Sequence, residues 1–169
     1  MSGRVIVDGY FASGKSSVAS ILARRLGVPV IRPFNDDTAP ELFGYIGQGD
    51  FARLDERARA ILRAAEDAAP ESAVFDRHWL SIAAYLPEAF RDGWATEPQT
   101  YLCWADLDTT VGRLIARAPH EPDRAAHGHF VNAYRALADE RNIPIVDTSH
   151  RAPDEAAEVI LEDLARTTR

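Results

Sequence analysis

The chain has 169 residues, of which 46% are hydrophobic and 27% charged, a composition typical of one folded domain rather than a disordered chain. Its formal net charge of −7 disfavours unspecific binding to nucleic acid or to an anionic membrane surface, because the long-range field repels polyanions. The lone cysteine, Cys103, excludes an internal disulfide and fits a reducing compartment. We therefore expect a cytoplasmic protein, one domain over residues 1–169, with neither a nucleic acid nor a membrane as partner.

The first third of the chain alternates short apolar runs with helical patterns. The run Val5, Ile6, Val7 predicts a buried strand over residues 4–7. A glycine-rich turn follows, and then apolar residues at helical spacing from Lys15 until Gly27 ends the helix. The next expected elements are a short strand at 28–32, a loop, and helices near 40–48 and 51–69.

The same alternation continues to the end of the chain. Residues 73–76 predict a strand ending in Asp76, and Asp108 is a plausible N-cap of a later helix ending at Arg117. The other expected elements are a helix over 79–91, a strand over 101–105, a loop or lid over about 118–128, a helix over 129–141, a strand over 143–147 and a helix over 154–166. Strands that alternate with helices predict an α/β fold, a three-layer α/β/α sandwich around a largely parallel sheet.

Residues 9–16 carry the most specific motif of the sequence. They read Gly-Tyr-Phe-Ala-Ser-Gly-Lys-Ser, which matches the phosphate-binding pattern Gly-x-x-x-x-Gly-Lys-Ser/Thr between a predicted strand and a predicted helix. Glycines let successive backbone N–H groups surround a phosphate, and the helix N-terminus adds partial positive charge. Lys15, the only lysine of the chain, can bridge the transferred phosphate, and Ser16 can ligate Mg²⁺. The predicted nucleotide contacts are Gly9, Ala12, Ser13, Gly14, Lys15, Ser16 and Ser17.

Several classes of phosphate-loop protein are disfavoured by the rest of the sequence. A regulatory GTPase reads guanine with an Asn-Lys-x-Asp element, and this chain has no second lysine. A motor or transporter ATPase carries Asp-Glu at the end of a strand, whereas the matching strand here ends in Asp76 followed by Arg77. Small-molecule kinases remain.

The residues after the third strand resemble a known family. The run 76–85, Asp-Arg-His-Trp-Leu-Ser-Ile-Ala-Ala-Tyr, is similar to the Asp-Arg-Tyr/His motif of thymidylate kinases, which is followed by a serine and an Ala-Tyr pair. The segments 101–117, 122–137 and 145–155 resemble that family's fourth strand, arginine-bearing lid and last strand and helix, in the same order. The resemblance implies five parallel strands in the order 2-3-1-4-5, use of ATP and Mg²⁺, and a homodimer.

The acceptor side departs from thymidylate kinases. Phe11 stands where that family has an acidic residue, and the loop, with Asp8 before it, looks more like that of deoxynucleoside kinases. After the second strand, arginines that hold an acceptor phosphate are replaced by Arg32 and then by Asp36 and Asp37. Carboxylates repel an incoming phosphate but can act as general base toward a hydroxyl. The pattern therefore favours a hydroxyl acceptor over a monophosphate.

The motif and the family resemblance together give each candidate residue an expected role. Asp76 is expected to act on Mg²⁺ or the acceptor, and Arg77 to clamp the acceptor or the transferred phosphoryl group. The expected catalytic residues are Lys15, Asp76, Arg77, Arg117 and Arg124, with Ser16 and Asp76 as metal ligands and Arg113 as a further nucleotide contact. The expected substrate contacts are Asp8, Phe11, Arg32, Asp36, Asp37 and Arg77.

The sequence thus predicts an ATP-dependent small-molecule kinase. It would transfer the γ-phosphoryl group of ATP to a nucleoside hydroxyl or to the phosphate of a nucleoside monophosphate. Two other readings stay open: a kinase of a non-nucleoside alcohol such as a sugar, an antibiotic or a biosynthetic intermediate, and an ATP-binding regulator without transfer.

Overall fold

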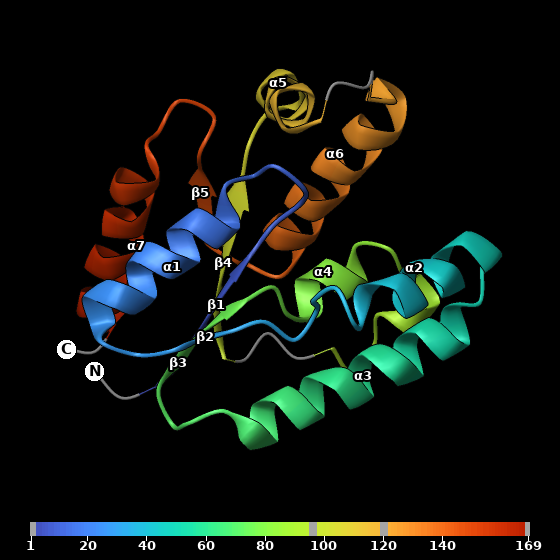
Figure 1. The fold of residues 1–169 in the computed structure, drawn as a ribbon, viewed down its shortest axis with the longest axis horizontal. Coiled ribbons are helices and arrows are strands. Elements are labelled where there is room, and N and C mark those ends of the chain that lie inside the picture. The colour runs from blue at the N-terminus through green and yellow to red at the C-terminus, as the bar shows by residue number, and fades with distance from the viewer. Residues whose placement is uncertain (1–2, 95–97, 119–121, 168–169) are drawn as a thin grey trace.

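A parallel sheet between two layers of helices forms the framework of the protein (Figure 1). The computed structural model describes residues 3–94, 98–118 and 122–167. Its strands are β1 (Arg4–Asp8), β2 (Val30–Ile31), β3 (Ala73–Asp76), β4 (Gln99–Trp104) and β5 (Ile145–Asp147). They lie in the order β2-β3-β1-β4-β5 and all pair in parallel, which confirms the predicted fold class and strand order.

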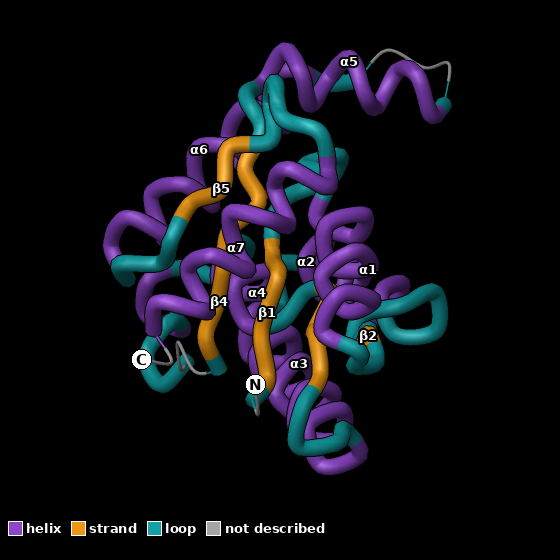
Figure 2. Tube along the Cα trace, turned by 90° about the vertical axis from the view of Figure 1, so that its left-hand side faces the viewer, coloured by secondary structure: helices purple, strands orange, loops and turns teal. Residues whose placement is uncertain are grey.

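Helices cover both faces of this sheet. The helices are α1 (Lys15–Leu26), α2 (Ala39–Gln48), α3 (Phe51–Ala68), α4 (Trp79–Ala83), the short 3₁₀ helix η1 (Glu88–Phe90), α5 (Leu107–Arg117), α6 (Arg124–Glu140) and α7 (Pro153–Thr167). Helices α1 and α7 pack on one face, which Figure 2 shows toward the viewer, and α3, α4 and α6 pack on the other (Figure 1). Helix α5 lies beyond the carboxyl ends of the strands in both views.

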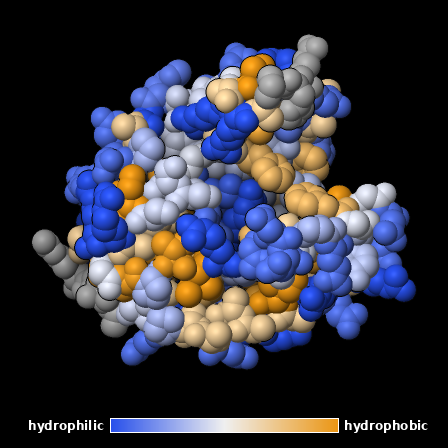
Figure 3. Space-filling view, viewed as in Figure 1, coloured by the Kyte–Doolittle hydropathy of each residue, from blue (hydrophilic) through white to orange (hydrophobic). Residues whose placement is uncertain are grey.

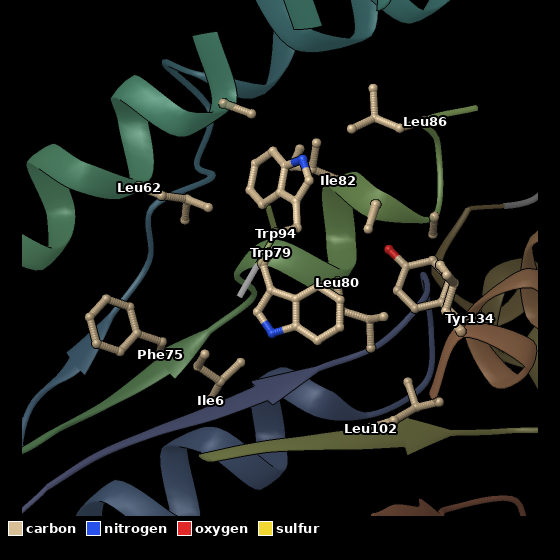
Figure 4. Packing of buried hydrophobic residues seen from close by; sticks show 14 of the residues in the cluster. Ile6, Leu62, Phe75, Trp79, Leu80, Ile82, Leu86, Trp94, Leu102 and Tyr134 are labelled. Carbon is tan, nitrogen blue, oxygen red and sulfur yellow. The ribbon is translucent and has the colours of Figure 1, made fainter. Parts of the chain in front are cut away.

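Alternation along the strands produces two separate cores. Val5 and Val7 of β1 face α1 and α7, whereas Ile6 faces the α3, α4 and α6 side, because successive side chains of a strand point to opposite faces. Trp79 is 2% exposed and packs over the strands near Ile6 and Phe75 (Figure 4). Because helices cover both faces of the sheet, both sides of each strand are buried. This explains why the strand sequences are continuous apolar runs. No helix among the described residues has the length and apolar character needed to cross a bilayer.

The boundaries of α4 and α5 differ from the predicted ones. The helix expected over 79–91 ends at Ala83, and only the 3₁₀ turn Glu88–Phe90 follows, because Pro87 lacks an N–H and disfavours helical backbone before it. The N-cap of α5 is Asp106 rather than Asp108, since its side chain accepts a bond of 2.7 Å from Thr109 N. Asp108 lies in the first turn of that helix.

The region expected to be a loop over 118–128 is helical in its second half. Helix α6 begins at Arg124 instead of 129, because Asp123 caps it by accepting bonds from Ala125 N and Ala126 N. Residues 119–121 lie outside the described part of the chain. The last strand is shorter than 143–147, at Ile145–Asp147, because Pro144 has no N–H to donate to a ladder.

Candidate active site

The loop after β1 has a backbone that only certain residues can adopt. Gly9 has φ 155°, and a Cβ there would lie 2.3 Å from the carbonyl oxygen of Cys103 on β4. Gly14 has φ 82° and Ala12 φ 58°, both in the left-handed region that costs a side chain energy. The two motif glycines are therefore required by contact and by conformation. The loop leads directly into α1 at Lys15.

The side chains of Lys15 and Ser13 are buried inside this loop and could form more hydrogen bonds than they do. Lys15 is 5% exposed, and its Nζ donates one bond of 3.3 Å to Tyr10 O. Burial, and after it the nearby Arg77 charge, lowers the pKa of Lys15 to about 7. Among the described residues, the buried Ser13 Oγ has no hydrogen-bond partner. A buried cation and an unpaired hydroxyl at the N-terminus of α1 fit a bound phosphate chain.

Asp76 joins the loop to β3. Ser16 Oγ donates to Asp76 Oδ1 at 3.1 Å, and Arg32 Nε, at the end of β2, pairs with Asp76 Oδ2 at 3.2 Å. The Asp76 carboxylate is almost fully buried, while the Arg32 side chain is half exposed. A hydroxyl and a carboxylate at the edge of a phosphate loop are the ligands that Mg²⁺ takes together with phosphate oxygens and water. The predicted pair of metal ligands thus lies together.

Arg77 lies beside the loop and follows directly after β3. Its guanidinium lies over the Phe11 ring at 5.0 Å, and its Nη1 donates to Ser81 Oγ at 3.2 Å. Its backbone has φ 76°, unusual for a residue with a side chain.

Asp8 is fully buried, and its carboxylate accepts bonds from Gly9 N, His78 N, Ser81 N and Ser81 Oγ. Burial raises the pKa of Asp8, and its oxygens face protein donors rather than the cavity.

An apolar cavity of about 210 Å³ opens next to Arg77. Its walls come from the loop, the segment after β2, α2 and α4, and its lining residues are Phe11, Phe34, Asn35, Asp36, Ala39, Leu42, Phe43, Ile46, Arg77, Ser81, Ile82 and Tyr85. Phe11 and Phe43 stack with ring centroids 6.1 Å apart, and Tyr85 meets Phe43 edge-on at 6.2 Å. Aromatic walls with a few polar groups are typical of a site for a small planar molecule.

A second cavity, of about 290 Å³, lies on the other side of the loop. It is lined by Gly14, Ser17, Val18, Arg113, Arg117, Thr148, Arg151 and Pro153. Arg113 of α5 closes it against the loop, because its Nη1 donates to Ala12 O at 3.1 Å and its Nη2 donates to Thr148 O. The two cavities flank the phosphate loop, and the space-filling view shows hydrophilic residues gathered in the middle of this face, near the loop after β1 (Figure 3).

Two predicted residues lie apart from this arrangement. Arg124, at the start of α6, forms an exposed ion pair of 2.6 Å with Asp108. Asp37 is exposed and lines neither cavity, although its neighbour Asp36 lines the apolar one. Arg117 is exposed at the second cavity. The structure thus brings together the loop, Asp76, Arg32, Arg77, Phe11 and Asp36, and separates Arg124 and Asp37 from them.

Some residues of the site were not predicted. Thr148 donates its hydroxyl to Ser13 O at 2.7 Å, and its place directly after β5 was a usable signal, because sites form at the carboxyl ends of parallel strands. Phe43 of α2 lines the apolar cavity, and only packing reveals this. Ser81 carried no signal by itself beyond its position in the Asp-Arg motif.

The fold has solved counterparts, although no family model and no curated protein sequence matches the chain. Deoxyadenosine kinase from M. mycoides with bound dATP superposes with a TM-score of 0.69 at 11% identity, covering 96% of this chain and 99% of that one. Thymidylate kinase from Candida albicans gives 0.65 at 16% identity, with 98% and 92% coverage. A gluconokinase from Sinorhizobium meliloti gives 0.63 at 20% identity, with 99% and 98% coverage. The chain therefore has the phosphate-loop fold found in nucleoside, nucleotide and sugar kinases.

Proposed function

We propose that the protein is an ATP-dependent kinase of a small molecule that carries a hydroxyl group, with a nucleoside as the favoured acceptor. The observation that carries this proposal is the phosphate loop with buried Lys15, flanked on one side by Asp76 and Arg77 with an apolar cavity beyond them. The solved structures of the same fold are of kinases of nucleosides, nucleotides and a sugar, which supports phosphoryl transfer as the reaction class.

The donor side is built by the loop and α5. Lys15 Nζ lies within the loop at the N-terminus of α1, where it would neutralise charge on the transferred group. Mg²⁺ bound with ATP would supply further charge neutralisation, held by Ser16 and Asp76. Arg113 and Arg117 line the cavity beside Gly14, which suits the remainder of the nucleotide. Closure of a lid at about 118–128 over the phosphates remains part of this proposal, and it would exclude water.

The acceptor side favours a neutral hydroxyl. Arg32 is paired with Asp76. We take the apolar cavity beside Arg77 as the acceptor cavity; among the described residues that line it, Arg77 is the cation and Asp36 the carboxylate. A monophosphate would meet that carboxylate, whereas a hydroxyl could give up its proton to it. We assign Asp36 as the general base and Arg77 as the clamp on the transferred group. Phosphoryl transfer then rests mainly on positioning and on charge neutralisation.

The acceptor class rests on the shape of the cavity. At its wall, the ring of Phe43 contacts those of Phe11 and Tyr85, and these aromatic rings suit contact with a base. A sugar-like alcohol is the second candidate, because a gluconokinase shares the fold at similar coverage. A homodimer and a cytoplasmic location also remain part of the proposal.

Transfer from γ-labelled ATP with Mg²⁺ tests the proposal directly. The acceptor panel contains 2′-deoxyadenosine, thymidine, thymidine monophosphate and gluconate, with products resolved by chromatography. Label in a nucleoside supports the favoured acceptor, and label in the monophosphate contradicts the role given to Asp36. Label found only in gluconate would replace the nucleoside by a sugar-like alcohol as the proposed acceptor. Tight ATP binding without any labelled product would overturn the kinase proposal in favour of a regulator.

A further inference from the structure

The buried carboxylate of Asp8 is held by donors from the segment that follows β3. Asp8 Oδ2 accepts bonds from His78 N (2.9 Å) and Ser81 N (3.0 Å), and Asp8 Oδ1 accepts from Ser81 Oγ (2.6 Å) and Gly9 N (2.7 Å). Asp8 and Ser81 are 0% and 4% exposed. Four donors on a buried carboxyl group fix its position, because a buried polar atom that loses its hydrogen bonds costs free energy. The start of the phosphate loop is thereby tied to the start of α4.

Arg77 lies next to both the start of the phosphate loop and the start of α4, the two segments that Asp8 ties together. Its backbone N donates to Val7 O at 3.1 Å, and the next residue, His78, donates its N to Asp8. These two bonds hold Arg77 in the left-handed conformation at φ 76°, which a residue with a Cβ keeps only when its surroundings determine it. The backbone of Arg77 is therefore positioned by Val7 and Asp8.

The side chain of Arg77 is positioned by the same carboxylate through Ser81. Because Ser81 donates its only hydroxyl proton to Asp8 Oδ1, its oxygen acts as the acceptor of the bond of 3.2 Å from Arg77 Nη1. The guanidinium also lies over the Phe11 ring. A side chain with four rotatable bonds is thus held by two contacts at the wall of the acceptor cavity, which lowers the entropy lost when it clamps a ligand.

We propose that Asp8 and Ser81 are positioning residues that act through Arg77: the buried Asp8 carboxylate orients the Ser81 hydroxyl, and that hydroxyl holds the Arg77 guanidinium toward the acceptor and the transferred phosphoryl group. The role replaces the direct substrate contact expected of Asp8. It also links the phosphate loop to the acceptor cavity, because the Asp8 carboxylate, at the start of the loop, fixes the position of Arg77. The expected effect on transfer kinetics rests on the proposed kinase function. The expected effect on the order of the Arg77 side chain does not.

The structural consequence is measured without any substrate. In the free protein, ¹⁵N relaxation of the Arg77 side-chain Nε–H signal, assigned by its loss in Arg77→Lys, reports how ordered the guanidinium is. We expect a rigid signal in the unsubstituted protein and a mobile one in Ser81→Ala. Ser72→Ala is the matched control, since Ser72 lies before β3 and accepts a bond from Gly3 N. An unchanged Arg77 signal in Ser81→Ala would overturn the proposal whatever the activity.

A double-substitution cycle measures the kinetic consequence. With 2′-deoxyadenosine, or the panel member phosphorylated fastest, we expect Ser81→Ala to lower kcat/KM for the acceptor about tenfold or more, while the Kd for ATP stays within about twofold. In an Arg77→Met background, Ser81→Ala should have little further effect, because its partner is already gone. Additive losses would show that Ser81 contacts the acceptor itself and would refute the positioning role. A rigid-to-mobile change in Arg77 with no transfer by the unsubstituted protein would instead refute only the kinase function.

Discussion

Ser16 and Asp76, sixty residues apart in sequence, are joined by a hydrogen bond of 3.1 Å from Ser16 Oγ to Asp76 Oδ1. The bond links the first turn of α1 to the end of β3, two elements that pack because β1 and β3 are neighbouring strands. Arg32 holds the second carboxylate oxygen. Both carboxylate oxygens of Asp76 are therefore held in place at the edge of the phosphate loop, where the proposed function puts a cation that arrives with the nucleotide.

Asp76→Asn tests this assignment. The amide keeps the size of the side chain but removes its charge, so we expect the Mg²⁺ concentration for half-maximal transfer to rise about tenfold or more, since Mg²⁺ prefers anionic oxygen ligands. The measurement is transfer rate against Mg²⁺ concentration at saturating ATP. Asp67→Asn, which removes an exposed carboxylate of α3, is the control. An unchanged Mg²⁺ requirement in Asp76→Asn would remove Asp76 from the metal site.

Lys15→Met removes the buried cation while filling its volume. Because Lys15 is 5% exposed and its charge is disfavoured by burial, the fold should survive, with an unfolding midpoint no lower than that of the unsubstituted protein. Transfer should fall by about 100-fold or more, since the lysine stabilises charge on the transferred group. Circular dichroism melting and the labelled-ATP assay measure the two effects. Transfer that persists in the folded variant would contradict the central assignment.

The pKa of Lys15 gives a pH-dependent prediction. Burial lowers this pKa to about 7, so at pH 8 most free molecules carry a neutral Lys15. Anionic phosphates in contact with it favour the charged form, and ATP binding at pH 8 should therefore take up nearly one proton. Affinity for ATP should decrease above pH 7, by at most about tenfold per pH unit. Calorimetry in buffers of different ionisation enthalpy measures the uptake, and Lys15→Met should show none of this component.

How far the sequence predicts this site depends on whether the signal is local. The strand, loop and helix that surround the phosphate-loop motif were predicted correctly, because the signals for all three are contiguous in the chain. Boundaries set by a competing residue were missed: Pro87 ends a periodic pattern that the sequence extended to 91, and Asp106 rather than Asp108 caps α5. Asp8 was predicted as an acid near the site, but that its oxygens face Ser81 follows only from packing.

Arg113 and Arg117, four residues apart on α5, should respond differently to substitution. Arg113 donates to two backbone carbonyls, Ala12 O and Thr148 O, so Arg113→Met should lower the free energy of unfolding by about 2 kcal/mol, as expected for lost charge-assisted bonds. Arg117→Met should change it by less than about 0.5 kcal/mol, because this side chain is exposed. Urea unfolding measures both values.

Both arginines line the cavity beside Gly14, so both variants should bind ATP more weakly. Titration with ATP and Mg²⁺ tests this point independently of stability. Equal destabilisation by the two substitutions would contradict the anchoring role of Arg113, and unchanged ATP affinity in both would mean that the nucleotide does not occupy this cavity.

Phe43 offers a test of acceptor class, because it lines the acceptor cavity and is 45% exposed. Its exposure means that Phe43→Ala should cost little stability, while loss of its ring should raise KM for a nucleoside about tenfold, the value of about one aromatic stacking contact. The Kd for ATP should not change, since Phe43 is not among the residues lining the cavity beside Gly14. Ile115→Ala, an equally exposed apolar residue on α5, serves as the control.

The same variant separates the two acceptor classes. A sugar-like alcohol has no flat face to place against Phe43, so Phe43→Ala should leave KM for gluconate unchanged or lower it by widening the cavity. A nucleoside depends on that ring, because Phe43 continues the stack that Phe11 begins. Steady-state kinetics with both acceptors therefore distinguish them within one protein. If KM for the nucleoside stays constant while that for gluconate rises, the aromatic wall binds something other than a base, and the favoured acceptor is wrong.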